Sequence, residues 1–139
     1  MRTLKILGML ALATTILAGC STAAATPKSA TVNATLTDMK ISLDKTNVPA
    51  GEITFVVKNS GGVVHELVVL QTTLAQDKIA MDMDEAGKMD ETGNVGETGD
   101  VEAGASKTFT VTLPAGHYVL MCNEIGHYGS GMHMTFTVN

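Results

Sequence analysis

The sequence has 139 residues, which suits one ordinary domain and is too short for two. Its residues are 45% apolar and 17% charged, so the chain can bury a core. With no Trp, three Phe and two Tyr, that core must be mainly aliphatic. The net charge of −5 and a single arginine, Arg2, argue against nucleic-acid binding through a basic face. Two cysteines exclude a disulfide-rich scaffold.

The N-terminus is typical of an export signal. Arg2 and Lys5 precede an apolar stretch over residues 6–17, which is shorter than the roughly 20 residues of a membrane-spanning helix. The stretch ends in L-A-G-C, which resembles the bacterial lipoprotein box, whose cysteine is acylated and becomes the mature N-terminus. We therefore expect a signal peptide over 1–19, a lipidated Cys20 and a flexible tether over 20–30, with the protein anchored to a membrane on its periplasmic or cell-surface side. The alternative is an ordinary signal peptide followed by an incidental cysteine.

The remaining residues, 31–139, are expected to form one folded domain of β-strands. Alternating or β-branched runs bounded by turn residues predict strands over 31–36, 40–43, 52–58, 65–70, 107–113, 117–122 and 133–138. Short strands separated by turn signals favour a Greek-key β-sandwich or barrel. We expect this all-β domain to be a monomer.

One stretch departs from the strand pattern. Residues 72–86 place Leu74, Ala75, Ile79, Ala80 and Met83 at roughly helical spacing, which predicts a short helix. Residues 87–104 are rich in Gly, Asp and Glu and are predicted to form a long loop with some extended structure.

Negative charge is concentrated in residues 77–102, called the acidic segment below. It holds nine of the 14 acidic residues and only two lysines. Such a segment is either a solvated insertion that promotes solubility or a docking face for a basic partner.

Four residues form a pattern with metal chemistry. Cys122, His127 and Met132 follow the spacing C-x4-H-x4-M in a Gly-rich loop between two predicted strands, and His65 begins an earlier strand. A thiolate, two imidazoles and one thioether are the ligand set of a blue-copper site, which suits both the monovalent and the divalent ion. Each of these residues alone would be interpreted as a structural residue of the core or surface. Their joint spacing favours a metal site. The other two histidines, His117 and His133, are not expected to bind the metal.

The stretch 113–138, with P-A-G-H-Y-V-L-M-C-N-E-I-G-H-Y-G-S-G-M, resembles the cupredoxins of the plastocyanin and azurin type, and its loop spacing is closest to auracyanin-like and sulfocyanin-like members. Upstream, N-S-G-G-V-V-H-E-L-V-V is similar to the region of the family's first ligand. The resemblance implies one copper ion held by His65, Cys122 and His127 in a plane, with Met132 as the axial ligand. It also implies a weak contact from the carbonyl of Val64, and a hydrogen bond from the Glu124 amide to the cysteine sulfur.

Three functions compete on this evidence. An electron carrier at a membrane surface, which passes single electrons between redox proteins and is not an enzyme, explains the complete ligand set. A copper chaperone or storage protein would in addition use Met81, Met83 and Met89 in the acidic segment, because thioethers bind monovalent copper. A small redox enzyme would need an open coordination position or a second metal. Met121 and Asn123 flank Cys122 where multicopper oxidases place histidines, which argues against oxygen reduction.

Overall fold

The computed structural model describes residues 28–139. The predicted signal peptide over 1–19 and the predicted lipidation site Cys20 lie outside the described residues. The first strand begins at Lys28, so residues 28–30, which the sequence assigns to the tether, already belong to the folded domain.

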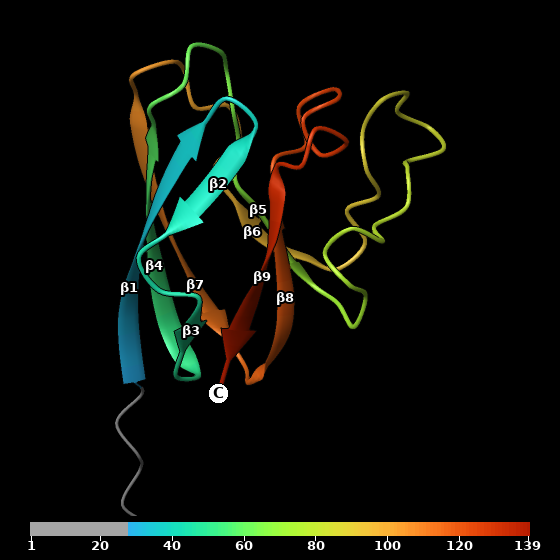
Figure 1. Cartoon of the computed structure of the whole chain (residues 1–139). Coiled ribbons are helices and arrows are strands. Elements are labelled where there is room, and N and C mark those ends of the chain that lie inside the picture. The colour runs from blue at the N-terminus through green and yellow to red at the C-terminus, as the bar shows by residue number, and fades with distance from the viewer. Residues whose placement is uncertain (1–27) are drawn as a thin grey trace, which may run out of the picture.

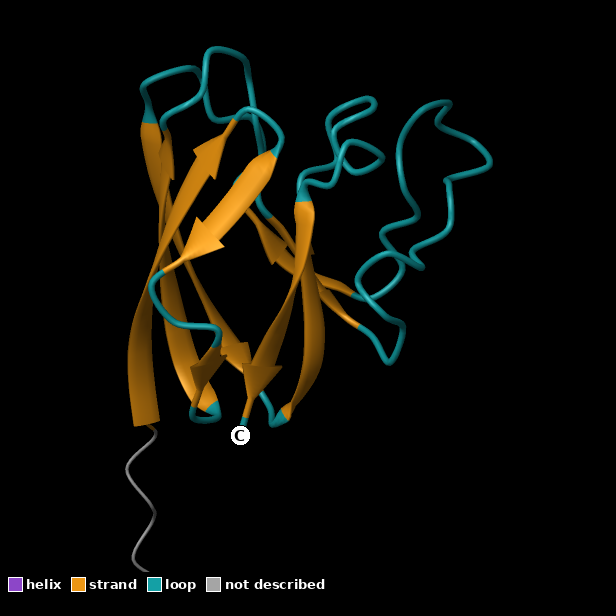
Figure 2. Ribbon diagram, in the orientation of Figure 1, coloured by secondary structure: helices purple, strands orange, loops and turns teal. Residues whose placement is uncertain are grey.

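The described chain is built from nine strands (Figures 1 and 2). They are β1 (Lys28–Thr37), β2 (Lys40–Leu43), β3 (Asn47–Val48), β4 (Gly51–Asn59), β5 (Val68–Gln71), β6 (Asn94–Glu97), β7 (Ser106–Leu113), β8 (Gly116–Met121) and β9 (His133–Val138). Residues 28–139 contain no helix, and therefore none that could cross a membrane.

The strands form two mixed sheets. One sheet has the order β2-β1-β4-β7 and the other β3-β9-β8-β5-β6. The pairs β1–β4 and β3–β9 are parallel, and the other pairs are antiparallel. The all-β class expected from the sequence is therefore confirmed.

The main core lies between the two sheets. Alternate residues of the strands point into it, such as Phe55 from β4 and Phe136 from β9, whose ring centroids lie 5.6 Å apart. Cys122 and Met132 belong to the same buried cluster. Two of the predicted site residues, Cys122 and Met132, are therefore part of the main core itself.

The second sheet is buried on its outer face as well. Residues 72–93 form a long connection between β5 and β6, called the covering loop below, which stands to the right of the sandwich in Figure 2. Ile79 and Met89 of this loop pack on a second buried cluster, formed by Val68, Leu70, Val119, Met121 and Tyr128. Burial on both faces explains why β5 reads as a continuous apolar run rather than an alternating one.

The helix predicted over 72–86 is wrong. The covering loop consists of turns and bends there, including a turn closed by the Lys78 amide on the Ala75 carbonyl at 2.9 Å. Its apolar residues do not share one buried face: Ile79 is buried, whereas Leu74 is 47% and Met83 is 94% exposed. Helical spacing therefore arose without the packing that stabilises a helix.

Candidate metal centre

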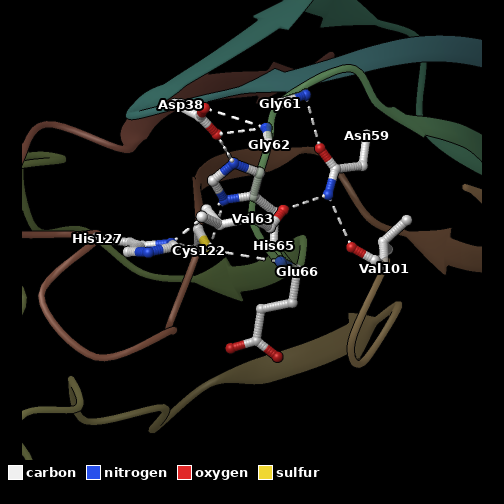
Figure 3. Close-up of polar contacts among 10 residues, drawn as sticks. All are labelled: Asp38, Asn59, Gly61, Gly62, Val63, His65, Glu66, Val101, Cys122 and His127. Carbon is white, nitrogen blue, oxygen red and sulfur yellow. Dashed lines mark hydrogen bonds and ion pairs between the residues drawn. The ribbon is translucent and has the colours of Figure 1, made fainter. Parts of the chain in front are cut away.

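The first candidate ligand, His65, lies in the connection between β4 and β5. Its backbone forms an isolated bridge with Val101, with the Val101 amide donating to the His65 carbonyl at 2.7 Å. The buried Asn59 side chain organises this connection, because its amide nitrogen donates to the carbonyls of Val63 and Val101 at 2.7 and 2.8 Å (Figure 3). Its amide oxygen accepts from the Gly61 amide at 2.8 Å.

The other three candidates lie on residues 122–132, the ligand loop, which connects β8 to β9. The loop is closed by its own backbone: the Cys122 amide donates to the Met132 carbonyl at 3.0 Å, and the Met132 amide donates to the His127 carbonyl at 3.1 Å. The His127 amide donates to the Glu124 carbonyl at 2.9 Å. These bonds tie the backbones of the three candidates together at one end of the sandwich.

Three donor atoms converge at this point. His65 Nδ1 and His127 Nδ1 lie 3.2 Å apart, and Cys122 Sγ lies 3.9 Å from the first and 3.4 Å from the second (Figure 3). Donors bound to one ion at about 2.0–2.3 Å and spread around a plane lie roughly 3.5–3.8 Å apart. The spacing and chemistry of this N-N-S group therefore fit a single metal ion of the copper or zinc class.

Met132, the predicted fourth ligand, is fully buried and belongs to the same core cluster as Cys122. Its backbone bonds place it between Cys122 and His127 at the base of the ligand loop. This placement is compatible with a Met132 thioether that lies beside the three donors.

Burial differs among the three donors. His65 and Cys122 are fully buried, whereas His127 is partly exposed. Burial, and then the neighbouring His65, lowers the pKa of His127, which favours the neutral imidazole that metals require. His127 is therefore the donor through which the site meets solvent.

The cysteine is held as a neutral thiol in the metal-free protein. Burial raises the pKa of the Cys122 thiol to about 11, while the backbone amides of Glu66 and Glu124 act in the opposite direction. The Glu66 amide donates to Cys122 Sγ at 3.4 Å. A metal would have to displace the thiol proton, and these amides would then stabilise the thiolate.

Glu66 is a residue that the sequence did not single out. It is only 7% exposed, and its Oε1 accepts from the Asn123 amide at 3.1 Å. Burial, and then the charges of Glu91 and Glu124, raise the pKa of Glu66 to about 7. It thus connects both ligand-bearing segments, through its amide to the sulfur and through its carboxyl group to the ligand loop.

His117 and His133 lie apart from the donor group. His117 Nδ1 is paired with the Thr72 carbonyl at 2.8 Å. The ring of His133 lies 4.6 Å from that of Tyr128, next to the second buried cluster. Strand alternation after Met132 accounts for the outward direction of His133.

Comparisons with known proteins agree with the fold. A family model described as a cupredoxin-like domain matches residues 8–138. Auracyanin B is 26% identical over 82% of this chain and 91% of its own, with a TM-score of 0.59. Auracyanin A, a "blue" copper protein from Chloroflexus aurantiacus, is 20% identical over 81% and 100%, with a TM-score of 0.59.

Rusticyanin from Thiobacillus ferrooxidans is 18% identical over 82% of this chain and 79% of its own, with a TM-score of 0.64. A comparison with curated proteins finds no match. The family model covers nearly the whole described domain, including all four predicted site residues. This chain belongs to the cupredoxin-like family.

Proposed function

We propose that this protein is a type 1 copper protein that transfers single electrons between redox partners. The observation that carries the proposal is the convergence of His65 Nδ1, His127 Nδ1 and Cys122 Sγ within hydrogen-bonding distance of one another at a buried rim. Copper, when bound there, would supply the exchange between its monovalent and divalent states.

The burial of the ligands suits electron transfer better than chemistry on a substrate. His65, Cys122 and Met132 are fully buried, so they exclude water from the metal and hold the ligand geometry within a packed core. The side chains of His65, Cys122, His127 and Met132 would hold the ion. The carbonyl of Val64 remains a candidate for a weaker contact.

Electrons would enter and leave through the partly exposed His127. Three loops at this end of the sandwich carry exposed apolar side chains: Met39 is 37%, Val63 is 46% and Ile125 is 67% exposed. Apolar side chains around an exposed ligand suit brief contacts with another redox protein.

The acidic segment offers a second contact for such a partner. A hollow of about 310 Å³ beside the ligand loop is lined mainly by carboxylates, with one lysine among them: Glu66, Asp82, Glu85, Lys88, Met89, Glu91, Glu97 and Asn123. We infer that this face steers a partner with a basic surface toward the copper end.

The membrane anchor is part of the same proposal. Acylation of Cys20 would confine the protein to a membrane surface, outside the cytoplasm, where redox partners are held. Replacing Cys20 with Ala should release the protein from the membrane fraction of its native host. Full recovery of the unchanged protein in the soluble fraction would refute the anchor without affecting the copper site.

Electron transfer is tested by copper loading followed by redox cycling. The copper-loaded protein should show an intense visible thiolate-to-copper band that is bleached by one electron equivalent per chain and fully restored on reoxidation. Cys122→Ser should abolish the band, because the transition originates on the sulfur. A wild-type protein that binds copper without this band would contradict the proposal.

Copper chaperoning or storage is a second candidate, favoured by one observation. Met81 and Met89 face each other across an isolated antiparallel bridge, flanked by bonds from the Asp82 amide to the Lys88 carbonyl and from the Asp90 amide to the Ala80 carbonyl. This pattern makes them a non-hydrogen-bonded pair, whose side chains leave the same face at close range. Met83 is 94% exposed two residues further on.

A titration of the reduced protein with monovalent copper separates the two candidates. The carrier should take up one equivalent, both before and after Met81, Met83 and Met89 are replaced together by Leu, which largely keeps volume and apolarity. A fall from two or more equivalents to one after this replacement would favour the chaperone.

A further inference from the structure

The buried ligand His65 has a partner outside the four ligands. Its Nε2 lies 3.1 Å from Oδ1 of Asp38, on the short turn between β1 and β2 (Figure 3). The His65 side chain is fully buried, whereas that of Asp38 is about half exposed. Because an ionised carboxylate can only accept, Nε2 of the neutral ring donates its proton to Asp38, which leaves the Nδ1 lone pair facing Cys122 and His127.

Asp38 is itself held in place from two sides. Both carboxylate oxygens accept from the Gly62 amide at 3.0 Å. The turn that carries Asp38 is tight: Met39 adopts a φ of 64°, in the left-handed region that side-chain-bearing residues seldom occupy. The turn thus orients the Asp38 carboxylate toward the buried His65 ring.

Gly61 leaves the space that this contact needs. A Cβ at Gly61 would lie 2.3 Å from Asp38 Oδ1 and 2.9 Å from His65 Nε2, so it would enter the hydrogen bond itself. A Cβ at Gly62 would lie no closer than 3.4 Å to Asp38 Oδ2, its nearest neighbour. Neither glycine has a positive φ, so the difference between the two positions is one of space alone.

We propose that Asp38 is the positioning residue of His65 and that the absence of a side chain at Gly61 preserves this role. The carboxylate fixes the ring orientation and the tautomer that turns the Nδ1 lone pair toward the other donors. Its negative charge also favours the more positive oxidised form of the site. This inference rests on the proposed copper function, although the tautomer can be tested without metal.

Removing Asp38 should affect the metal more than the fold. In the copper-loaded full chain, Asp38→Ala should speed copper loss to a chelator by about 10–100-fold and raise the reduction potential. Asp38→Asn keeps an acceptor oxygen and removes the charge. It should therefore raise the potential while speeding copper loss less than tenfold. Wild-type copper loss and potential in Asp38→Ala, with only a lower melting temperature, would overturn the proposal and reduce Asp38 to a tie between two loops.

Gly61→Ala and Gly62→Ala form a matched pair. Gly61→Ala, which displaces the Asp38 carboxylate but keeps its charge, should speed copper loss as Asp38→Ala does, and Gly62→Ala, which keeps the amide donor, should speed copper loss much less. Equal behaviour of the two variants would contradict the role of the space at Gly61.

The metal-free protein separates this inference from the proposed function. Imidazole ¹⁵N–¹H correlation spectra should show His65 protonated at Nε2 and not at Nδ1 in the wild type, and a mixture of tautomers in Asp38→Ala. An unchanged tautomer in Asp38→Ala would refute positioning even if copper binds. A wild type that never develops the thiolate band would refute the copper function and leave the tautomer result valid.

Discussion

At the residue scale, burial divides the candidate ligands into a fixed set and an accessible one. His65, Cys122 and Met132 are fully buried, and His127 is partly exposed. Substitutions of the three buried ligands should therefore change the visible spectrum or the reduction potential of the copper site. Water cannot take the place of a lost side chain there without disturbing the core.

Met132 provides the sharpest residue-scale prediction. Met132→Gln should keep the thiolate-to-copper band and lower the reduction potential, because a harder oxygen ligand favours divalent copper. Visible absorption and voltammetry measure both. Met134→Gln is the control: Met134 lies two residues further along, partly buried against the core, and its replacement should leave the potential in place. If the spectrum and the potential were unchanged in Met132→Gln but changed in Met134→Gln, Met134 rather than Met132 would be the thioether ligand.

Residue types and spacing were enough to select the side chains that the fold brings together. Cys122, His127 and Met132 are close in sequence, so their joint pattern is visible without a fold. The roles of Asp38 and Glu66 were not predictable in this way. Asp38 lies 27 residues from His65, and Glu66 reads as an ordinary strand residue until the ligand loop folds over it.

At the scale of elements, two side chains of the ligand loop, Asn123 and Tyr128, hold the covering loop to the sandwich. The Asn123 side chain accepts from the Met89 amide at 2.7 Å and donates to the Met89 carbonyl at 3.0 Å. The Tyr128 hydroxyl accepts from the Ile79 amide at 3.0 Å and donates to the Gln76 carbonyl at 2.7 Å. This pair of bonds couples the loop after β5 to the loop that carries His127.

Tyr128→Phe should loosen the covering loop. It removes both bonds and leaves the buried Ile79 amide without its partner, at a cost of about 1–3 kcal/mol in the free energy of unfolding. Hydrogen exchange at the Ile79 amide should accelerate. Tyr118→Phe is the control, because its hydroxyl donates to the Pro114 carbonyl elsewhere in the fold, so it should leave Ile79 exchange unchanged. Equal protection of Ile79 in wild type and Tyr128→Phe would show that the Tyr128 hydroxyl does not hold this part of the loop.

A carboxylate where β2 ends makes the first sheet sensitive to acid. Asp44 accepts from the Asn33 amide and side chain, both at 2.8 Å, and these bonds together with Lys45 lower the pKa of Asp44 to about 2. The depressed pKa stabilises the fold above the ordinary value of 3.8, and this contribution is lost as the pH falls from there through about 2. Urea unfolding of Asp44→Asn should therefore lose less stability over this pH range than the wild type. Parallel pH profiles would contradict this role.

Local sequence patterns predicted most of the strands. They failed for segments whose structure is determined by packing against distant parts of the chain. The predicted strands at 52–58, 107–113 and 133–138 correspond to β4, β7 and β9 within one residue at each end. The two-residue β3 was missed, because its pairing partner β9 is distant in sequence. The Gly-containing β6 lies in the stretch 87–104, for which the sequence predicted a loop with some extended structure but no defined strand. The helix predicted over 72–86 failed because Leu74 and Met83 face solvent, so the spacing marked no common face.

At the scale of the whole molecule, the main core is complete without metal. Buried side chains from both sheets, including Phe55 and Phe136, pack together with Cys122 and Met132 in the metal-free protein. We expect the metal-free protein to keep a β-rich far-ultraviolet dichroism spectrum and a cooperative thermal transition, with copper raising the melting temperature. A coil-like spectrum without metal would contradict a preformed site.

The concentration of acid on one face predicts salt-dependent association. Neutralising Asp82, Asp84, Glu85, Asp90 and Glu91 together should slow electron exchange with a small basic cytochrome and flatten its dependence on ionic strength, because steering by net charge is screened over about 8 Å at physiological salt. Stopped-flow kinetics at several salt concentrations measure this. The copper band should be retained, since none of the five is a proposed ligand. An unchanged salt dependence would leave the acidic segment without a docking role.

The location of copper tests the central claim most directly. Anomalous diffraction at the copper absorption edge, from crystals of the copper-loaded protein, should show one strong peak per chain, between His65 Nδ1, Cys122 Sγ and His127 Nδ1 and beside the Met132 sulfur. A peak near Met81 and Met89 or in the carboxylate-lined hollow, with none between the two histidines and the cysteine, would contradict the type 1 copper site.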